Sequence, residues 1–153
     1  MSNWRVKAGL VAAALFVTPL ASQEMKAHGD HNPHHGGIVL MYGMDLHYEV
    51  VLSAGGRVQL WLSDGTRDDL PAGTVSDVAV EIEKSGGKRE TVDMAIGATG
   101  ESWEGQGSAV KDVGAVLHLA FVFHEEPAVV SFPVSALMGA GREQFVRDST
   151  HGK

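Results

Sequence analysis

The chain contains no cysteine among its 153 residues. This absence excludes a disulfide framework, a thiolate metal site and a lipidated cysteine anchor. The sequence also lacks the G-x-G-x-x-G, P-loop, G-x-S-x-G and H-E-x-x-H patterns, so the common nucleotide-binding and hydrolase signatures are missing and we expect no enzyme. Aromatic residues make up only 7% of the chain, whereas the 19 glycines predict many turns.

Basic residues are scarce as well. Twelve Lys and Arg stand against 19 Asp and Glu, which gives a net charge of −7 at pH 7. An acidic chain is a poor partner for nucleic acid. The same charge is compatible with a cation as ligand, although excess acid also serves solubility.

Residues 1–27 look like a secretory signal peptide. Arg5 and Lys7 precede an apolar run over residues 8–20, and this run is short of the roughly 20 residues that a membrane span needs. We therefore expect export to the periplasm, cleavage, and no stable membrane anchor afterwards; an uncleaved anchor helix is the alternative. A cut after Ala27 would make His28 the new N-terminus, whose amine and imidazole together suit Cu(II).

A histidine-rich arm follows at residues 28–37. It holds four of the eight histidines in the chain, namely His28, His31, His34 and His35. Pro33 and the pair Gly36 and Gly37 disfavour a regular helix or a central strand, so the arm should be irregular and flexible. Neutral imidazole is a common ligand of late first-row metals, which makes the arm a candidate metal site. The alternative is a solvated tail that binds metal only adventitiously.

Residues 38–153 are predicted to form one all-β domain. Apolar side chains alternate with polar ones between glycine-rich turns, which is typical of half-buried strands. About seven or eight short strands indicate an antiparallel β-sandwich or small barrel. We expect residues 97–107 to be a glycine-rich connection, residues 135–147 a short helical turn or a tail, and Pro133 to lie in an edge strand. The predicted core comprises Tyr48, Val50, Leu60, Leu62, Val80, Ile82, Leu119 and Phe121.

The scaffold offers further candidate ligands. His47 and Glu49 lie on the outward face of a predicted strand, and a hairpin over residues 38–47 could return His47 to the Gly36 corner. Glu49 is expected either to bind the metal, to orient a histidine, or simply to face solvent. Met41 and Met44 flank the turn of this hairpin and could assist Cu(I), or either of them could fill the core.

At this point a resemblance can be named. The runs HHGGIVL (residues 34–40) and DLHYEVVL (residues 45–52) resemble the periplasmic HGG domain that accompanies copper/silver and cobalt/zinc/cadmium efflux systems. The resemblance covers roughly residues 28–62, in which His35 corresponds to the motif histidine and His47 and Glu49 to the following strand. It implies a soluble periplasmic metal-binding or metallochaperone role, with a periplasmic efflux adaptor subunit as a candidate partner.

The sequence thus favours a copper chaperone, buffer or efflux accessory, taking Cu(II) or Cu(I), with zinc as a second metal. We expect His34 and His35 to converge with His47 on one ion, with His28 or His31 completing the set of ligands. Two other functions stay open. The domain could be an interaction module of an efflux complex with incidental metal binding, or a copper-dependent oxidative enzyme that uses an N-terminal His28.

Overall fold

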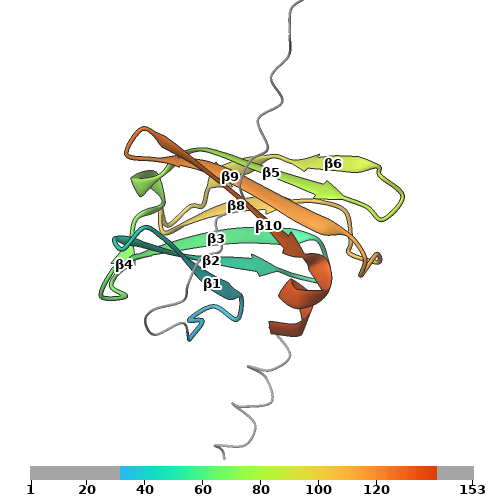
Figure 1. The fold of residues 1–153 in the computed structure, drawn as a ribbon, viewed down its shortest axis with the longest axis horizontal. Coiled ribbons are helices and arrows are strands. Elements are labelled where there is room, and N and C mark those ends of the chain that lie inside the picture. Colours follow the sequence, from blue (N-terminus) through green and yellow to red (C-terminus); the bar gives the residue numbers. More distant parts are fainter. Residues whose placement is uncertain (1–31, 141–153) are drawn as a thin grey trace, which may run out of the picture.

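Two antiparallel sheets form the protein in the computed structural model, which describes residues 32–140. The predicted signal peptide, His28, His31 and residues 141–153 lie outside the described residues. Figure 1 shows the sheets as two layers with the strands running roughly alongside one another. The all-β sandwich predicted from the alternating pattern is therefore confirmed.

The larger sheet has six strands in the order β1-β2-β3-β8-β7, with β4 added to one end of β3. The smaller sheet has the order β10-β9-β5-β6. The strands are β1 (Ile38–Tyr42), β2 (Leu46–Leu52), β3 (Arg57–Asp64), β4 (Asp69–Leu70), β5 (Ser76–Glu83), β6 (Arg89–Val92), β7 (Met94–Ile96), β8 (Ser102–Gln106), β9 (Val116–Phe123) and β10 (Glu126–Pro133). A single 3-10 turn, η1 (Ala72–Thr74), precedes β5, and residues 134–140 are helical.

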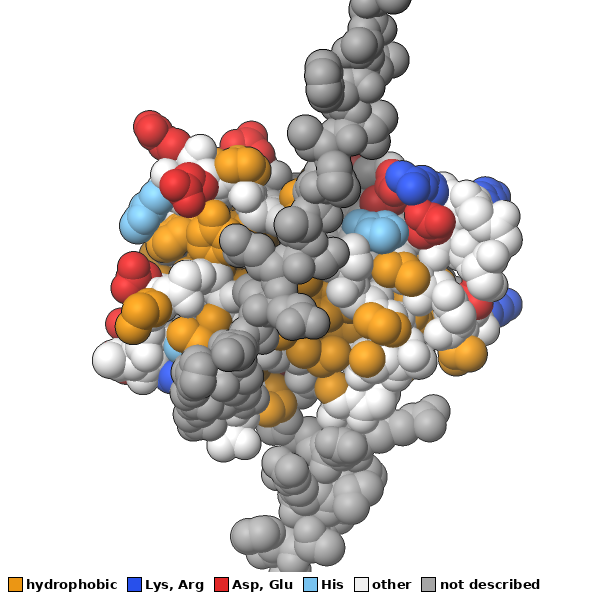
Figure 2. Space-filling view, viewed as in Figure 1, with side chains coloured by type: hydrophobic (Ala, Val, Ile, Leu, Met, Phe, Trp, Pro, Cys, Tyr) orange, Lys and Arg blue, Asp and Glu red, His pale blue; other side chains and the backbone are white. Residues whose placement is uncertain are grey.

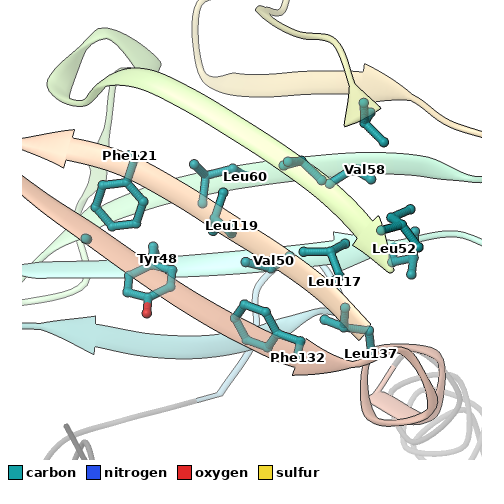
Figure 3. Close-up of a cluster of buried hydrophobic side chains, with 14 of the residues drawn as sticks. Tyr48, Val50, Leu52, Val58, Leu60, Leu117, Leu119, Phe121, Phe132 and Leu137 are labelled. Atoms are coloured by element: carbon teal, nitrogen blue, oxygen red, sulfur yellow. The ribbon is translucent and has the colours of Figure 1, made fainter. Parts of the chain in front are cut away.

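The core lies between the facing surfaces of the two sheets (Figure 3). All eight residues of the predicted core are buried, with exposed fractions of 1–6%. The alternating pattern placed them correctly because successive side chains of a strand point to opposite faces of the sheet. Pro133 ends β10, which is an edge strand as expected, since proline cannot donate to a neighbouring strand on its amide side.

One segment differs from the sequence prediction. Residues 97–107 contain strand β8, where we expected a connection. A Cβ on Gly105 would lie 2.7 Å from Val92 Cγ1 and 2.8 Å from the Asp93 carbonyl oxygen. Gly105 therefore lets β8 pass close to the point where the chain leaves β6 in one sheet and enters β7 in the other. The glycine marks a close approach of two backbones inside the sheet.

Edge strands β1 and β10 lie on the same side of the sandwich. The Tyr42 hydroxyl donates to Glu126 at 3.3 Å, which links these two edges across the gap between the sheets. Figure 2 shows hydrophobic side chains on this face of the molecule. On β1 and β10, the partly buried hydrophobic residues that pack against the core are Ile38, Leu40, Tyr42 and Val130. Among residues 32–140, no helix is long and apolar enough to cross a membrane.

Candidate metal centre

The candidate centre lies on the outer face of the six-stranded sheet. The register of β1, β2 and β3 sets Met41, His47 and Ser63 side by side in one row. The next row along the same face contains Glu49 and Trp61. Residues directly opposite one another in antiparallel strands share a face, with their Cβ atoms about 4.5–5.5 Å apart. The outward orientation predicted for His47 and Glu49 is therefore confirmed.

Although they face outward, His47 and Glu49 are only 2% and 4% exposed. The reading of Glu49 as an ordinary solvent-facing side chain is therefore wrong. A buried carboxylate costs free energy unless hydrogen bonds replace the lost water. The contacts of Glu49 show how this cost is met.

The Glu49 carboxylate fastens the described part of the arm, residues 32–37, to the sheet. Its Oε1 accepts the backbone N–H groups of His35 and Gly37, both at 2.8 Å. Its Oε2 accepts the backbone N–H of His34 at 2.9 Å and lies 3.2 Å from Nδ1 of His35. Hydrogen bonds to a charged acceptor are the stronger kind, and both oxygens already have two donors. Of the two chemical roles expected for Glu49, the geometry corresponds to the orientation of a histidine.

The two glycines permit this close docking. Gly36 has a φ of +81°, in the left-handed region that favours glycine. A Cβ on Gly37 would collide with the Val50 carbonyl of β2 and would lie 2.9 Å from Val51 Cγ2. The first glycine therefore turns the chain and the second lets it pass against β2, which brings the Gly37 amide to Glu49.

The contacts of the His35 ring fix its orientation and, for the neutral ring, imply its tautomer. It stacks on the Trp61 indole with ring centroids 3.8 Å apart and planes inclined by 5°. Because a carboxylate only accepts hydrogen bonds, the Nδ1 atom facing Glu49 carries the proton of the neutral ring. The lone pair then resides on Nε2, the nitrogen that a metal ion would bind.

His47 is held in the same manner by a different acceptor. Its Nδ1 lies 2.8 Å from the backbone carbonyl oxygen of Asp64, which also only accepts. The neutral His47 ring therefore also carries its lone pair on Nε2. A short turn over residues 64–68 holds this carbonyl in place. The Asp64 side chain accepts hydrogen bonds from the hydroxyl and backbone N–H of Thr66 and from the backbone N–H of Asp68. These hydrogen bonds, led by the Thr66 hydroxyl, hold the pKa of the Asp64 carboxyl below its ordinary value.

Arg67 joins this turn to the start of the arm. Its guanidinium donates to the backbone carbonyl of Asn32 at 2.8 Å and to the Ser63 hydroxyl at 3.3 Å. Arg67 has a φ of +74°, an uncommon conformation for a residue with a Cβ. Arg67, His34, His35 and Asp69 help to line one small pocket between the arm and the sheet.

The candidate ligands within the described residues do not form a complete metal site. The ring centroids of His34 and His35 are 6.3 Å apart. His118 is on β9 in the other sheet, where its Nδ1 lies 2.8 Å from the Ser131 hydroxyl, so it does not belong to this centre. Within residues 32–140, no group of three or more His, Asp or Glu side chains could hold a metal ion. Convergence of His34, His35 and His47 on one ion, with His28 or His31, therefore stays a prediction.

Three contributors to the centre escaped the sequence analysis: the Trp61 ring, the Arg67 guanidinium and the Asp64 carbonyl. Trp61 carried a usable signal, because a large aromatic residue stood on the predicted outward face of its strand. The register of the hairpin over residues 46–64 would have set it opposite Glu49. No sequence signal marked the other two, because their contacts depend on the conformation of one turn.

In comparisons with known proteins, the chain matches no family model, no curated protein and no solved structure. The resemblance to the HGG domain consequently rests on the residues of the arm and the first hairpin alone.

Proposed function

We propose that this chain is an exported, non-enzymatic metal-binding protein of the periplasm, acting as a copper chaperone, buffer or efflux accessory. The observation that carries the proposal is that the His35 and His47 rings have the same hydrogen-bonding arrangement. His35 and His47 each have Nδ1 against a group that only accepts hydrogen bonds, so each presents Nε2 as a lone-pair donor. An acceptor at the distal nitrogen is the usual support of a metal-binding histidine, because it fixes the tautomer and raises the basicity of the ligand.

The residues fit a copper ion better than a hard cation. Imidazole suits copper and zinc, and the divalent series ranks Cu(II) above Zn(II) at the same nitrogen site. Glu49 is occupied by four donors and serves to orient the arm. The ligands we assign are nitrogens of His34, His35 and His47, with His28 or His31 completing the set. Because the described side chains do not already form such a group, metal binding would have to draw them together. Copper is thus the expected metal, and zinc the second choice.

Export is the other half of the proposal. It is supported by Arg5 and Lys7 ahead of the short apolar run. Mass spectrometry of the protein from a periplasmic fraction should give a mature N-terminus between residues 21 and 31. Full-length chain recovered with the membranes would contradict it.

The binding test is a competition titration with Cu(II) against a chelator of known affinity. The variants are His35→Ala and His47→Ala, with His118→Ala as the matched control, because His118 is a hydrogen-bonded histidine on the other sheet. Loss of either proposed ligand should lower the affinity for Cu(II) by at least the roughly 10–100-fold seen when only an outer-shell partner of a metal ligand is lost. His118→Ala should bind as the wild type does. If His47→Ala also binds like wild type while the fold is intact, the arm takes up metal alone and the shared site is wrong.

A further inference from the structure

Met41 of β1 lies directly opposite His47 of β2. We propose that its thioether binds the metal together with the Nε2 atom of His47, and that this pair makes the site one for Cu(I). The proposal rests on the proposed function, since it names the oxidation state that the same site selects. It concerns a sulfur ligand from β1, in addition to the nitrogen ligands of the arm.

The first observation is the register of the first hairpin. Met41 of β1 is directly opposite His47 of β2, so both side chains leave the outer face of the sheet. In such a pair the Cβ atoms are about 5 Å apart. A methionine side chain has three rotatable bonds and adapts to a neighbouring group, so its sulfur can reach an ion that His47 holds.

The second observation separates Met41 from the methionines that fill the core. Met94 and Met138 are partly buried and pack against the buried cluster between the sheets. Met41 is also partly buried, but its row on the outer face contains His47 and Ser63, both of which are buried. Met44, at the turn of the same hairpin, is 82% exposed. Of these four methionines, Met41 is the one whose place in the fold suits a ligand.

The third argument is chemical. A thioether is a soft ligand that prefers Cu(I), whereas imidazole accepts either oxidation state of copper. His47 is 2% exposed, so an ion bound there is largely removed from water. Low charge and a low coordination number reduce the cost of that removal, which again favours Cu(I) over Cu(II).

The test compares Cu(I) and Cu(II) binding in three forms of the mature protein. Cu(I) affinity is measured anaerobically against a chromogenic Cu(I) chelator, and Cu(II) affinity by the competition described above. Met41→Leu preserves volume and hydrophobicity, so the fold should be retained, as thermal unfolding will verify. Met44→Leu is the matched control, because Met44 is only three residues from Met41 in the chain but is exposed.

We expect Met41→Leu to lower the Cu(I) affinity by about tenfold or more, with less than about a twofold change for Cu(II). X-ray absorption of the Cu(I) form should show copper–sulfur scattering in the wild type and in Met44→Leu, and none in Met41→Leu. Unchanged Cu(I) affinity in Met41→Leu, or persistent sulfur scattering, overturns the inference while leaving the histidine site intact. Failure of the wild type to bind copper in either state would overturn the proposed function itself.

Discussion

Replacing Glu49 by Gln tests the link between the arm and the sheet. The change preserves the size of the side chain and exchanges one carboxylate oxygen for an NH2 group. If the remaining oxygen takes the place of Oε1, it still accepts the N–H groups of His35 and Gly37. The NH2 group then faces the His34 amide and Nδ1 of His35, both of which were donors to Oε2.

Two consequences follow from this exchange. The His34 amide loses its acceptor. An unsatisfied donor costs about 1–3 kcal/mol when it is buried, and the lower end of this range applies because His34 is exposed and this hydrogen bond is only partly buried. The remaining bonds also lose their charge assistance, so we expect unfolding free energy to fall by about 2–4 kcal/mol. At His35, the NH2 group can donate to Nδ1 only if the proton moves to Nε2. The substitution should therefore switch the His35 tautomer and remove the lone pair that the proposed copper site needs.

The assays measure these effects separately. Urea unfolding gives the free energy of unfolding, and nitrogen-15 NMR of the imidazole rings gives the His35 tautomer. We expect the proton on Nδ1 in the wild type and on Nε2 in Glu49→Gln. Glu101→Gln is the control, since Glu101 is exposed and should change stability by less than about 0.5 kcal/mol. A Glu49→Gln protein with wild-type stability and an unchanged His35 tautomer would refute the role we assign to the carboxylate.

Three further predictions concern the scaffold. Leu119→Ala should cost about 2–5 kcal/mol in urea unfolding, because Leu119 is 1% exposed in the core. Gly37→Ala should detach the arm, since its Cβ collides with the Val50 carbonyl; hydrogen exchange at the His35 amide would then accelerate, and an unchanged rate would count against the docking. Stability should fall as the pH drops below about 4. The Ser85 hydroxyl and backbone N–H lower the pKa of the Asp112 carboxyl in the folded protein, and the backbone N–H of Ser108 lowers the pKa of the Glu90 carboxyl. This stabilisation is complete above the unfolded-state pKa and is lost as the pH falls through the lower folded-state pKa. An unfolding free energy that stays constant between pH 5 and pH 2 would contradict the assignment.

The fold could be predicted from the sequence wherever one side of a strand faces the core. Period-two alternation identified β2, β3, β5 and β9, because burial of one face imposes that pattern. The signal failed for β8, whose sequence SWEGQ has no apolar/polar alternation and only one strong β-former, Trp103. Strand β8 pairs with β3, which is distant in sequence, and with β7, which directly precedes it, and local propensity does not report the pairing with β3.

The candidate site was accessible only in part, and for a related reason. Alternation placed His47 and Glu49 on one face, and the two glycines marked the corner of the arm. The Asp64 carbonyl beside His47 was out of reach, and Trp61 under His35 could be placed only through the register of β2 with the neighbouring strand β3. Residues far apart in the chain meet only after the register of two hairpins is set.

The same hydrogen bonds serve the fold and the proposed chemistry. Nδ1 of His35 helps to anchor the arm to Glu49, and this contact determines which nitrogen is left for a ligand. Nδ1 of His47 instead lies against the Asp64 carbonyl at the end of β3, and this contact determines the tautomer of His47. Loss of the Glu49 contact should therefore disturb His35 and leave the tautomer of His47 unchanged. This difference allows NMR of the two rings to distinguish a local loss of arm docking from general unfolding of the sheet.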